Sequence, residues 1–458
     1  MGEKLWGGRF KKKLDKEIFE FTKSISFDKR LAFYDIEGSI AHAKMLGKSG
    51  IISQKEKELL VEGLKEVKKE ILKIKFENEE DIHTLVINLL RKRVGDVADK
   101  LHIGRSRNDQ VVLDLRLYCR NEVKEIIGRI RKLQISLLER AKKLKALTIP
   151  FYTHLKNAQC IIFAHQFLAY LQMLERDKER LKESLERIDI MPLGSGAGRG
   201  STLPLDRFFL AKELGFSCVS ENSLDAVSDR DFVIEVLSNL SILGMHLSRI
   251  CEDLILFSSD EIGFIEGDDA HFTGSSILPH KKNPDPLELI RGYSGKIYGD
   301  LISVLVTMKG LPLSYNRDMQ LDKPPLFDSV EIIKKSISVL GKIISKIKVN
   351  EERLKKASAK EFLFSTDLAE FLVTKGYSWQ KAHTLVGKLI LESEEKKKPI
   401  REMSDKHLKK IIPELNKEII SELLEPLKSV RRIKTYGGSS PAEVTRQLAS
   451  WEQRLKRD

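Results

Sequence analysis

The stretch SDRDFVIEVLSNLSILGMHLSRICEDL, residues 228–254, has a regular hydrophobic pattern. Its apolar residues alternate three and four positions apart, at Val233, Val236, Leu240, Leu243, Leu247, Ile250 and Leu254. This is the spacing of a heptad seam, and it predicts a long helix that packs lengthwise against other helices. Ser228 and Asp231 have the spacing of a capping box, which predicts that the helix begins there.

Four other segments share this periodicity. Residues 126–144 and 330–347 are heptad seams, and Pro150 is expected to end the first. Residues 161–188 and 287–308 continue the helical pattern, and Pro284 and Pro286 suit the first turn of the latter. Five long helices predict an all-helical bundle. Because the seams are more apolar than one bundle needs, we expect a symmetric dimer or tetramer.

The composition is that of a globular protein with two or three domains, since the 458 residues are 41% hydrophobic and 32% charged. No apolar stretch reaches the roughly 20 residues of a membrane span, and no signal-peptide pattern is present, so we expect a cytoplasmic protein. A dinucleotide fold is not expected, because no GxGxxG follows a strand pattern. The cysteines form no CxxC pair and the histidines no HExxH, so we expect a mechanism without a metal. We expect no organic cofactor either.

The formal net charge of +13 has two interpretations. Clustered Lys and Arg residues could bind nucleic acid. The basic runs are short, however, and they are mixed with acidic residues and lack aromatic neighbours. We therefore favour a solvated, Lys/Glu-rich helical surface, with no nucleic-acid or membrane partner. Such a surface would also attract an acidic small substrate.

Two loops interrupt the helical pattern. Residues 193–200, LGSGAGRG, lack the GxxxxGK[ST] of a phosphate-binding loop, so we interpret them as a structural turn between two helices. Residues 263–283 form a second loop, and loops of this length are usually functional or disordered. It contains most of GSSILPHKKNP, residues 274–284, with hydroxyls, a cation and an amide. A base and such donors suit proton removal beside a carboxylate, but an ordinary polar surface loop explains the same composition.

The segment 274–284 resembles the GSSxMPxKxN signature of the fumarase/aspartase superfamily. KKNPD, residues 281–285, resembles the corresponding motif of the argininosuccinate lyase branch. Further resemblances to that branch follow in the expected order: WGGRF at 6–10, DIH at 81–83, LHIGRSRNDQ at 101–110, NSLDA at 222–226 and DMQLDK at 318–323. The likeness is dense up to residue 325 and looser beyond it.

This resemblance implies a tetrameric helical enzyme. We expect an N-terminal helical domain, a central long-helix bundle that forms the tetramer core and a C-terminal helical domain, over residues 1–106, 107–355 and 356–458. Each active site would be built from three chains. The implied reaction is the reversible β-elimination of argininosuccinate to arginine and fumarate, the last step of arginine biosynthesis.

By resemblance, Ser275 is the base that removes a proton, and Lys281 and Asn283 stabilise the resulting dianionic carboxylate. His154, held by Glu288, assists proton transfer, although serine and histidine could exchange the roles of base and acid. Thr153 and His154 are expected to begin a helix-like run.

Arg107 and Asn108 could belong to a salt-bridged loop, but argininosuccinate carries three carboxylates, and a guanidinium group with an amide donor suits a carboxylate clamp. The substrate-binding residues implied by the resemblance are Ser24, Asp28, His83, Arg107, Asn108, Thr153, Asn283, Tyr315, Gln320 and Lys323.

The chain departs from the branch's usual residues at several positions, which bear on substrate affinity more than on reaction type: Ile103, Asn157, Cys160, His280 and the pair Gly198 and Arg199. Three alternatives stay open. They are another lyase of the superfamily, a non-catalytic crystallin-like protein on the same scaffold, and a nucleic-acid-binding protein.

Overall fold

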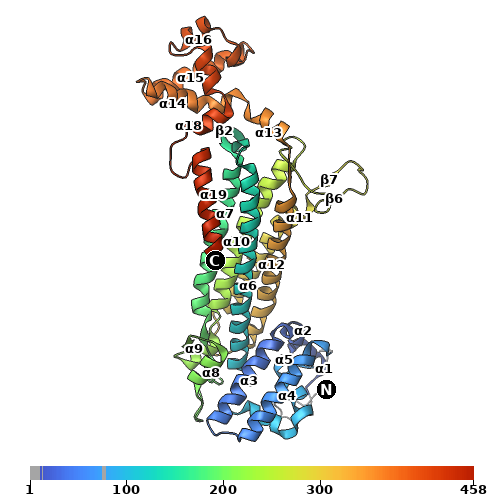
Figure 1. The fold of residues 1–458 in the computed structure, drawn as a ribbon. Coiled ribbons are helices and arrows are strands. Elements are labelled where there is room, and N and C mark those ends of the chain that lie inside the picture. The colour runs from blue at the N-terminus through green and yellow to red at the C-terminus, as the bar shows by residue number, and fades with distance from the viewer. Residues whose placement is uncertain (1–10, 13, 75–78, 458) are drawn as a thin grey trace. The chain divides into compact units, whose positions relative to one another are not determined.

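The computed structural model describes residues 11–12, 14–74 and 79–457, and the WGGRF motif at 6–10 lies outside them. These residues are mostly helical, and their strands form only two-stranded sheets (Figure 1). The prediction of an all-helical fold is confirmed. No helix of the described chain is long and apolar enough to cross a membrane.

All five predicted long helices are present: α6 (Arg107–Leu144), α7 (Phe163–Ile188), α10 (Asp231–Ser258), α11 (Asp285–Met308) and α12 (Lys323–Lys346). The seam that predicted α10 is its buried face, because every seam residue from Val233 to Leu254 is at most 1% exposed. Burial of such a side chain contributes roughly 1.5–3 kcal/mol relative to exposure. The hydrophobic periodicity therefore describes the packing of the helix correctly.

The start of α10 differs from the prediction. Ser228 is the last residue of α9 (Ser223–Ser228), and its hydroxyl donates to the carbonyl of Asp225 at 3.1 Å. The N–H of Asp231 instead donates to the Asp229 carboxylate at 2.7 Å. The predicted capping box at Ser228 and Asp231 is wrong, because a short helix capped by Asn222 already contains Ser228.

The described chain forms two compact units that are discontinuous in sequence, because each of the five long helices contributes to both. The first unit contains the described residues up to Gly128, Asp177–Met245 and Tyr293–Lys335. Its other elements are α1 (Lys16–Thr22), α2 (Ile25–Asp28), η1 (Lys29–Leu31), α3 (Ala32–Lys48), α4 (Gln54–Glu70), η2 (Ile71–Lys73), α5 (Ile82–Val94), η3 (Gly95–His102), β3 (Ile190–Met191), α8 (Arg207–Leu214), β4 (Cys218–Val219), α9 and η4 (Arg317–Asp322).

The second unit contains Arg129–Arg176, His246–Gly292 and Ser336–Asp458, of which residues to 457 are described. Its other elements are β1 (Thr148–Thr153), β2 (Lys156–Ile162), β5 (Ile265–Glu266), β6 (Thr273–Gly274), β7 (Lys282–Asn283), β8 (Lys348–Val349), α13 (Glu351–Ser358), η5 (Glu361–Phe364), α14 (Ser365–Thr374), α15 (Trp379–Glu395), η6 (Ile400–Glu402), α16 (Asp405–Ile411), α17 (Lys417–Leu423), α18 (Pro426–Arg432) and α19 (Pro441–Arg457). The division into three sequence domains stays a prediction.

The long helices form a bundle inside each unit. In the first unit, Arg116 of α6 donates to the Arg187 carbonyl of α7 at 2.8 Å, and Lys334 of α12 pairs with Glu122 of α6 at 2.7 Å. In the second unit, the Tyr170 hydroxyl of α7 donates to Asp253 of α10 at 2.7 Å. The polar contacts join helices whose apolar seams are buried.

The segment around His154 is a β-hairpin, and the predicted helix-like run is wrong. Strand β1 pairs antiparallel with β2, and Thr153 is opposite Lys156. His154 and Leu155 form the turn with φ of 53° and 57°. Two successive positive φ values are typical of the tight turns whose twist matches that of paired strands. Helix α6 ends at Leu144, before Pro150, which lies in β1.

A seam residue should carry a large share of the stability. We expect Leu240→Ala to lower the free energy of unfolding by about 2–5 kcal/mol, because the fully buried side chain leaves a cavity. Leu391→Ala, at a 53% exposed position of α15, is the matched control and should change it by less than about 0.5 kcal/mol. Denaturant unfolding at one protein concentration measures both. Equal effects would contradict the assignment of this seam as core.

Candidate active site

The first unit contains a polar cavity of about 180 Å³ where four distant segments meet. The segments are the start of α2, the start of α5, the start of α6, and η4 with its flanking residues. All but two of the residues predicted to bind substrate line it: Ser24, Asp28, His83, Arg107, Asn108, Tyr315, Gln320 and Lys323. The sequence analysis did not assign the other lining residues, Asp81, Val111 and Arg317.

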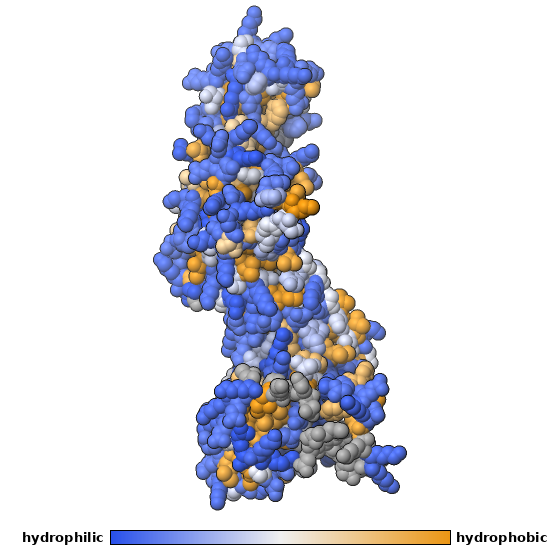
Figure 2. All heavy atoms as spheres, turned by 90° about the vertical axis from the view of Figure 1, so that its right-hand side faces the viewer, coloured by the Kyte–Doolittle hydropathy of each residue, from blue (hydrophilic) through white to orange (hydrophobic). Residues whose placement is uncertain are grey.

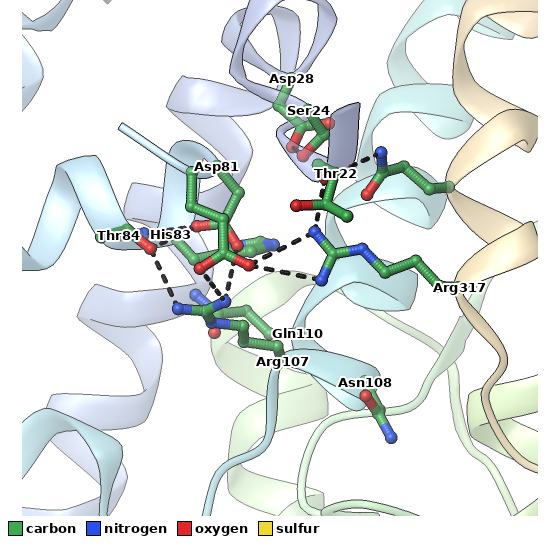
Figure 3. Close-up of polar contacts among 12 residues, drawn as sticks. Thr22, Ser24, Asp28, Asp81, His83, Thr84, Arg107, Asn108, Gln110 and Arg317 are labelled. Atoms are coloured by element: carbon green, nitrogen blue, oxygen red, sulfur yellow. Dashed lines mark hydrogen bonds and ion pairs between the residues drawn. The ribbon is translucent and has the colours of Figure 1, made fainter. Parts of the chain in front are cut away.

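Arg107 is held in place by acidic neighbours. Its guanidinium lies 3.0 Å from the Asp81 carboxylate and 3.4 Å from that of Glu80, and it donates to the Thr84 hydroxyl at 3.0 Å. Arg317 approaches Glu80 to 3.3 Å, and Figure 3 shows the two guanidinium groups reaching the acidic side chains from different sides. Burial raises the pKa of Asp81, but His83, Arg107 and two hydrogen bonds from Thr84 outweigh burial, and the pKa lies below its usual value.

Lys323 provides a second cation at the cavity. It is 3% exposed, and its ammonium lies 3.9 Å from Asp28 and 3.7 Å from Asp322. The Ser24 hydroxyl also donates to Asp28. Burial raises the pKa of Asp28 above its usual value, although Lys323 and Ser24 oppose this effect. The Lys323 side chain thus lies among carboxylates at the cavity wall, where an anionic ligand can approach it.

The other lining residues are positioned in different ways. Gln320 donates to the carbonyl of Thr22 at 3.3 Å, and Tyr315 is mostly buried, which raises its pKa. In Figure 3, Asn108 lies apart from the dashed contacts, so its amide has no partner among the residues drawn. The site therefore combines fixed cations with a less constrained amide.

Asp109 links the start of α6 to the glycine-rich loop 193–200. Its Oδ1 accepts the N–H of Ser106 at 3.0 Å, and its Oδ2 accepts those of Gly194 and Gly196 at 2.9 and 2.8 Å. Both glycines have positive φ, of 90° and 61°, which favours glycine over other residues. The loop connects the α7–β3 segment to α8, as the interpretation of a structural turn requires. Asp109 was missed, although it follows Arg107 and Asn108 in the motif at 101–110.

Behind the cavity, the ligand-type atoms of Asp35, His83 and Asp114 lie within 4.8 Å of one another. His83 Nδ1 lies at hydrogen-bonding distance, 2.8 Å, from Asp35. Arg105 already contributes a positive charge that acts on both carboxylates. We interpret the three side chains as a hydrogen-bonded His83–Asp35 pair with Asp114 nearby, and not as metal ligands.

The residues predicted to carry out proton transfer lie in the second unit. Ser275 and Lys281 are in the loop between β6 and β7, where the Ser275 hydroxyl accepts the N–H groups of Ile277 and Leu278 at 3.3 and 3.1 Å. Glu288 is in the first turn of α11 and His154 in the hairpin turn, both exposed. Among the described residues, no hydrogen bond or ion pair joins the members of this set.

Thr153 and Asn283, the remaining predicted binding residues, end β1 and β7 in the second unit, and neither lines the cavity. Within a single chain, the predicted binding residues of the first unit thus lie around one cavity. Within the described ranges, the predicted catalytic residues are not joined to one another by hydrogen bonds or ion pairs.

Comparison with known proteins identifies the class first: residues 8–299 match the family described as lyase. Residues 362–431 match the family described as argininosuccinate lyase C-terminal. The argininosuccinate lyase of Acetivibrio thermocellus is 50% identical over 456 residues, which cover 99% of both chains. That of Syntrophus aciditrophicus is 48% identical over 453 residues, covering 98% of this chain and 96% of the other. The chain belongs to the argininosuccinate lyase family, and the predicted family is confirmed.

Solved structures agree on the fold. An EDDS lyase in complex with formate has a TM-score of 0.85 and 25% identity, and the match covers 94% of this chain and 87% of that one. The class II fumarase of Schistosoma mansoni has a TM-score of 0.75 at 18% identity, with 87% and 90% coverage.

Asp109 offers a test of how the cavity wall is held. Asp109→Asn keeps one acceptor oxygen and places an amide donor against backbone N–H groups, so we expect a loss of about 1–3 kcal/mol in the free energy of unfolding. Asp206→Asn, at the half-buried N-cap of α8, is the control and should cost about 1 kcal/mol or less. Chemical denaturation measures both, and an unchanged stability of Asp109→Asn would show that the loop does not depend on this carboxylate.

Proposed function

We propose that this chain catalyses the reversible elimination of argininosuccinate to arginine and fumarate, the last step of arginine biosynthesis. The observation that carries the proposal is the cavity of the first unit, in a chain about half identical to argininosuccinate lyases along its whole length. The substrate has three carboxylates, and Arg107 and Lys323 place two cations at this cavity. Charged hydrogen bonds from such groups are the natural way to bind it.

The proposed mechanism begins when Ser275 removes a proton from the carbon beside a succinyl carboxylate. Lys281 and Asn283 stabilise the negative charge that develops on that carboxylate. The carbon–nitrogen bond then breaks, and the guanidino group leaves as arginine while the double bond of fumarate forms. His154, oriented by Glu288, assists the proton transfer to the leaving group. These steps require neither a metal nor an organic cofactor.

We propose that the site is completed by neighbouring chains in a homotetramer. Ser275 lies in a loop and His154 in a hairpin turn, and in the described chain no hydrogen bond or ion pair joins them to each other or to Glu288, which supports a site shared between subunits. The second half of α11 also presents exposed apolar residues on one face: Tyr298, Ile302, Leu305 and Val306. Figure 2 shows hydrophobic groups at the surface on the side where Figure 1 labels α11. A second copy of the bundle would bury such a stripe.

Other superfamily lyases are the main alternative, and the curated relatives favour argininosuccinate as the substrate. A non-catalytic role is disfavoured because Ser275, His154, Lys281 and Glu288 are all present. We expect a cytoplasmic enzyme that binds neither nucleic acid nor membranes. Release of fumarate from argininosuccinate, followed by its ultraviolet absorbance, tests the proposal directly. Turnover of malate or aspartate, with none of argininosuccinate, would overturn it.

The base is tested by Ser275→Ala. Turnover should fall by a factor on the order of 10² to 10⁴, because positioned base catalysis has this magnitude. The thermal unfolding transition should be unchanged, because Ser275 lies in a surface loop. Turnover close to that of the unmodified enzyme would remove Ser275 from the role of base.

Two adjacent lysines provide a matched pair. Lys281→Met should lower kcat more than it raises KM, because the charge that it stabilises grows in the transition state. Lys282→Met is the control, since Lys282 is engaged with Glu266 at 3.0 Å and Asp269 at 2.5 Å. Steady-state kinetics separates kcat from KM. A rise in KM alone for Lys281→Met would make Lys281 a ground-state binding residue.

Sharing of sites between chains predicts complementation. Ser275→Ala and His154→Gln should each be inactive, and activity should reappear when the two are unfolded and refolded together, since some mixed sites then contain neither change. Simple mixing without subunit exchange is the control and should restore nothing. Co-refolded tetramers that remain inactive would mean that both residues reach the site from one chain.

A further inference from the structure

His83 lines the cavity, and two buried carboxylates hold it from behind. Its Nδ1 lies 2.8 Å from Asp35 Oδ1 and 3.7 Å from Asp114 Oδ2. Asp35, on α3, is 1% exposed, and Asp114, on α6, is fully buried. Neither carboxylate lines the cavity, and the sequence analysis assigned neither a role. With Nδ1 engaged by Asp35, Nε2 is the ring nitrogen that His83 can offer to a ligand.

The two carboxylates have few other partners. Gln110 also donates to Asp35 Oδ1, but Asp35 Oδ2 and both oxygens of Asp114 are buried without a hydrogen-bond partner in the described chain. Unpaired buried carboxylates are costly, so a nearby positive charge is required. Burial and the charge of Asp35 raise the pKa of Asp114 well above its usual value. Asp35 is therefore the anion of the pair, and the imidazole in contact with it is its cation.

We propose that Asp35 is a positioning residue for the reaction: it accepts the Nδ1–H of His83 and holds the ring as an imidazolium whose Nε2–H is left to bind an anionic group of the substrate. This inference rests on the proposed function. A neutral imidazole protonated at Nδ1 would present a lone pair at Nε2, which repels a carboxylate. The Asp35 carboxylate thus decides whether His83 Nε2, the ring nitrogen that faces the cavity, donates or accepts a hydrogen bond.

The charges around His83 come from each element packed against it. Carboxylates face it from α2, α3, α6 and the residue before α5: Asp28, Asp35, Asp114 and Asp81. Cations and a further imidazole nearby are Arg105, Arg107, Lys323 and His102. Burial lowers the pKa of His83, but Asp35, Asp81 and Asp28 outweigh it, and the pKa lies above its usual value. These carboxylates therefore favour the imidazolium form of His83 over the neutral ring.

The decisive variant is Asp35→Asn. The amide oxygen can still accept the Nδ1–H, so the geometry is kept while the negative charge is lost. His83 should then lose its proton as the pH rises through the neutral range, and KM for argininosuccinate at pH 8 should rise roughly 10–100-fold, the value of a charged hydrogen bond. Near pH 6 the KM should return towards that of the unmodified enzyme, and kcat should change less than KM at both pH values.

The control is Asp229→Asn. Asp229 pairs with Arg116 in the same unit but does not line the cavity or contact His83. Its loss should affect stability and leave the pH dependence of KM unchanged. A purely structural role of Asp35 would give the same pattern as this control, with no new titration, and would overturn the proposal.

A second measurement reads the protonation state of His83 in the unmodified enzyme and does not depend on the folding of Asp35→Asn. Nitrogen-15 NMR of the histidine-labelled enzyme, with the His83 signals assigned by their loss in His83→Gln, reports the protonation of both ring nitrogens. We expect both to carry protons at pH 7.5, and a neutral His83 would overturn the proposal.

If the enzyme failed to release fumarate while His83 was an imidazolium, the proposed function would fail, and the positioning role of Asp35 for this reaction would fail with it. The NMR result would still stand for the His83–Asp35 pair.

Discussion

Burial of apolar seams along long helices is the constraint on which the rest of the structure depends. The seam of α10 is almost completely removed from water, and the same five helices form a bundle within each compact unit. A heptad seam is buried only where helices pack lengthwise against one another, so the middle of each long helix is committed to the core. The functional groups are therefore confined to helix ends and to the loops between them, where the backbone is free to change direction.

The cavity of the first unit shows how helix ends create a polar site. Asp81 caps α5, and Arg107 and Asn108 open α6, whose first turn is tied to the glycine-rich loop through Asp109. Helix N-termini have unpaired N–H groups and a positive dipole, which favours carboxylates there. The carboxylates in turn hold Arg107 and His83 as oriented cations. The meeting of helix N-termini at the cavity thus explains why acidic residues gather there, and these acidic residues explain why Arg107 and His83 are held beside them.

The predicted binding residues of the first unit and the predicted catalytic residues of the second unit differ in how they are held. Ser275, Lys281 and His154 lie on a loop and a hairpin turn, exposed or half-buried and without mutual contacts in the described chain. Residues of this kind are costly to preorganise on one chain, because flexible loops lose entropy when they are held. Assembly of several copies would supply the rigid surroundings that one chain lacks.

The sequence by itself determined the five long helices, the core face of α10, the family and most of the residues that line the cavity, because hydrophobic periodicity and local motifs are properties of neighbouring residues. It did not reveal the hairpin at His154, since two positive φ values are selected by strand pairing and not by the residues themselves. The roles of Asp35, Asp114 and Arg317 were also hidden. These three residues lie outside the sequence motifs. Only the packing of α3 and α6 brings Asp35 and Asp114 to His83, and only the position of η4 brings Arg317 to Glu80. Tertiary structure decided these contacts because electrostatic interaction depends on distance in space, which the order of residues does not contain.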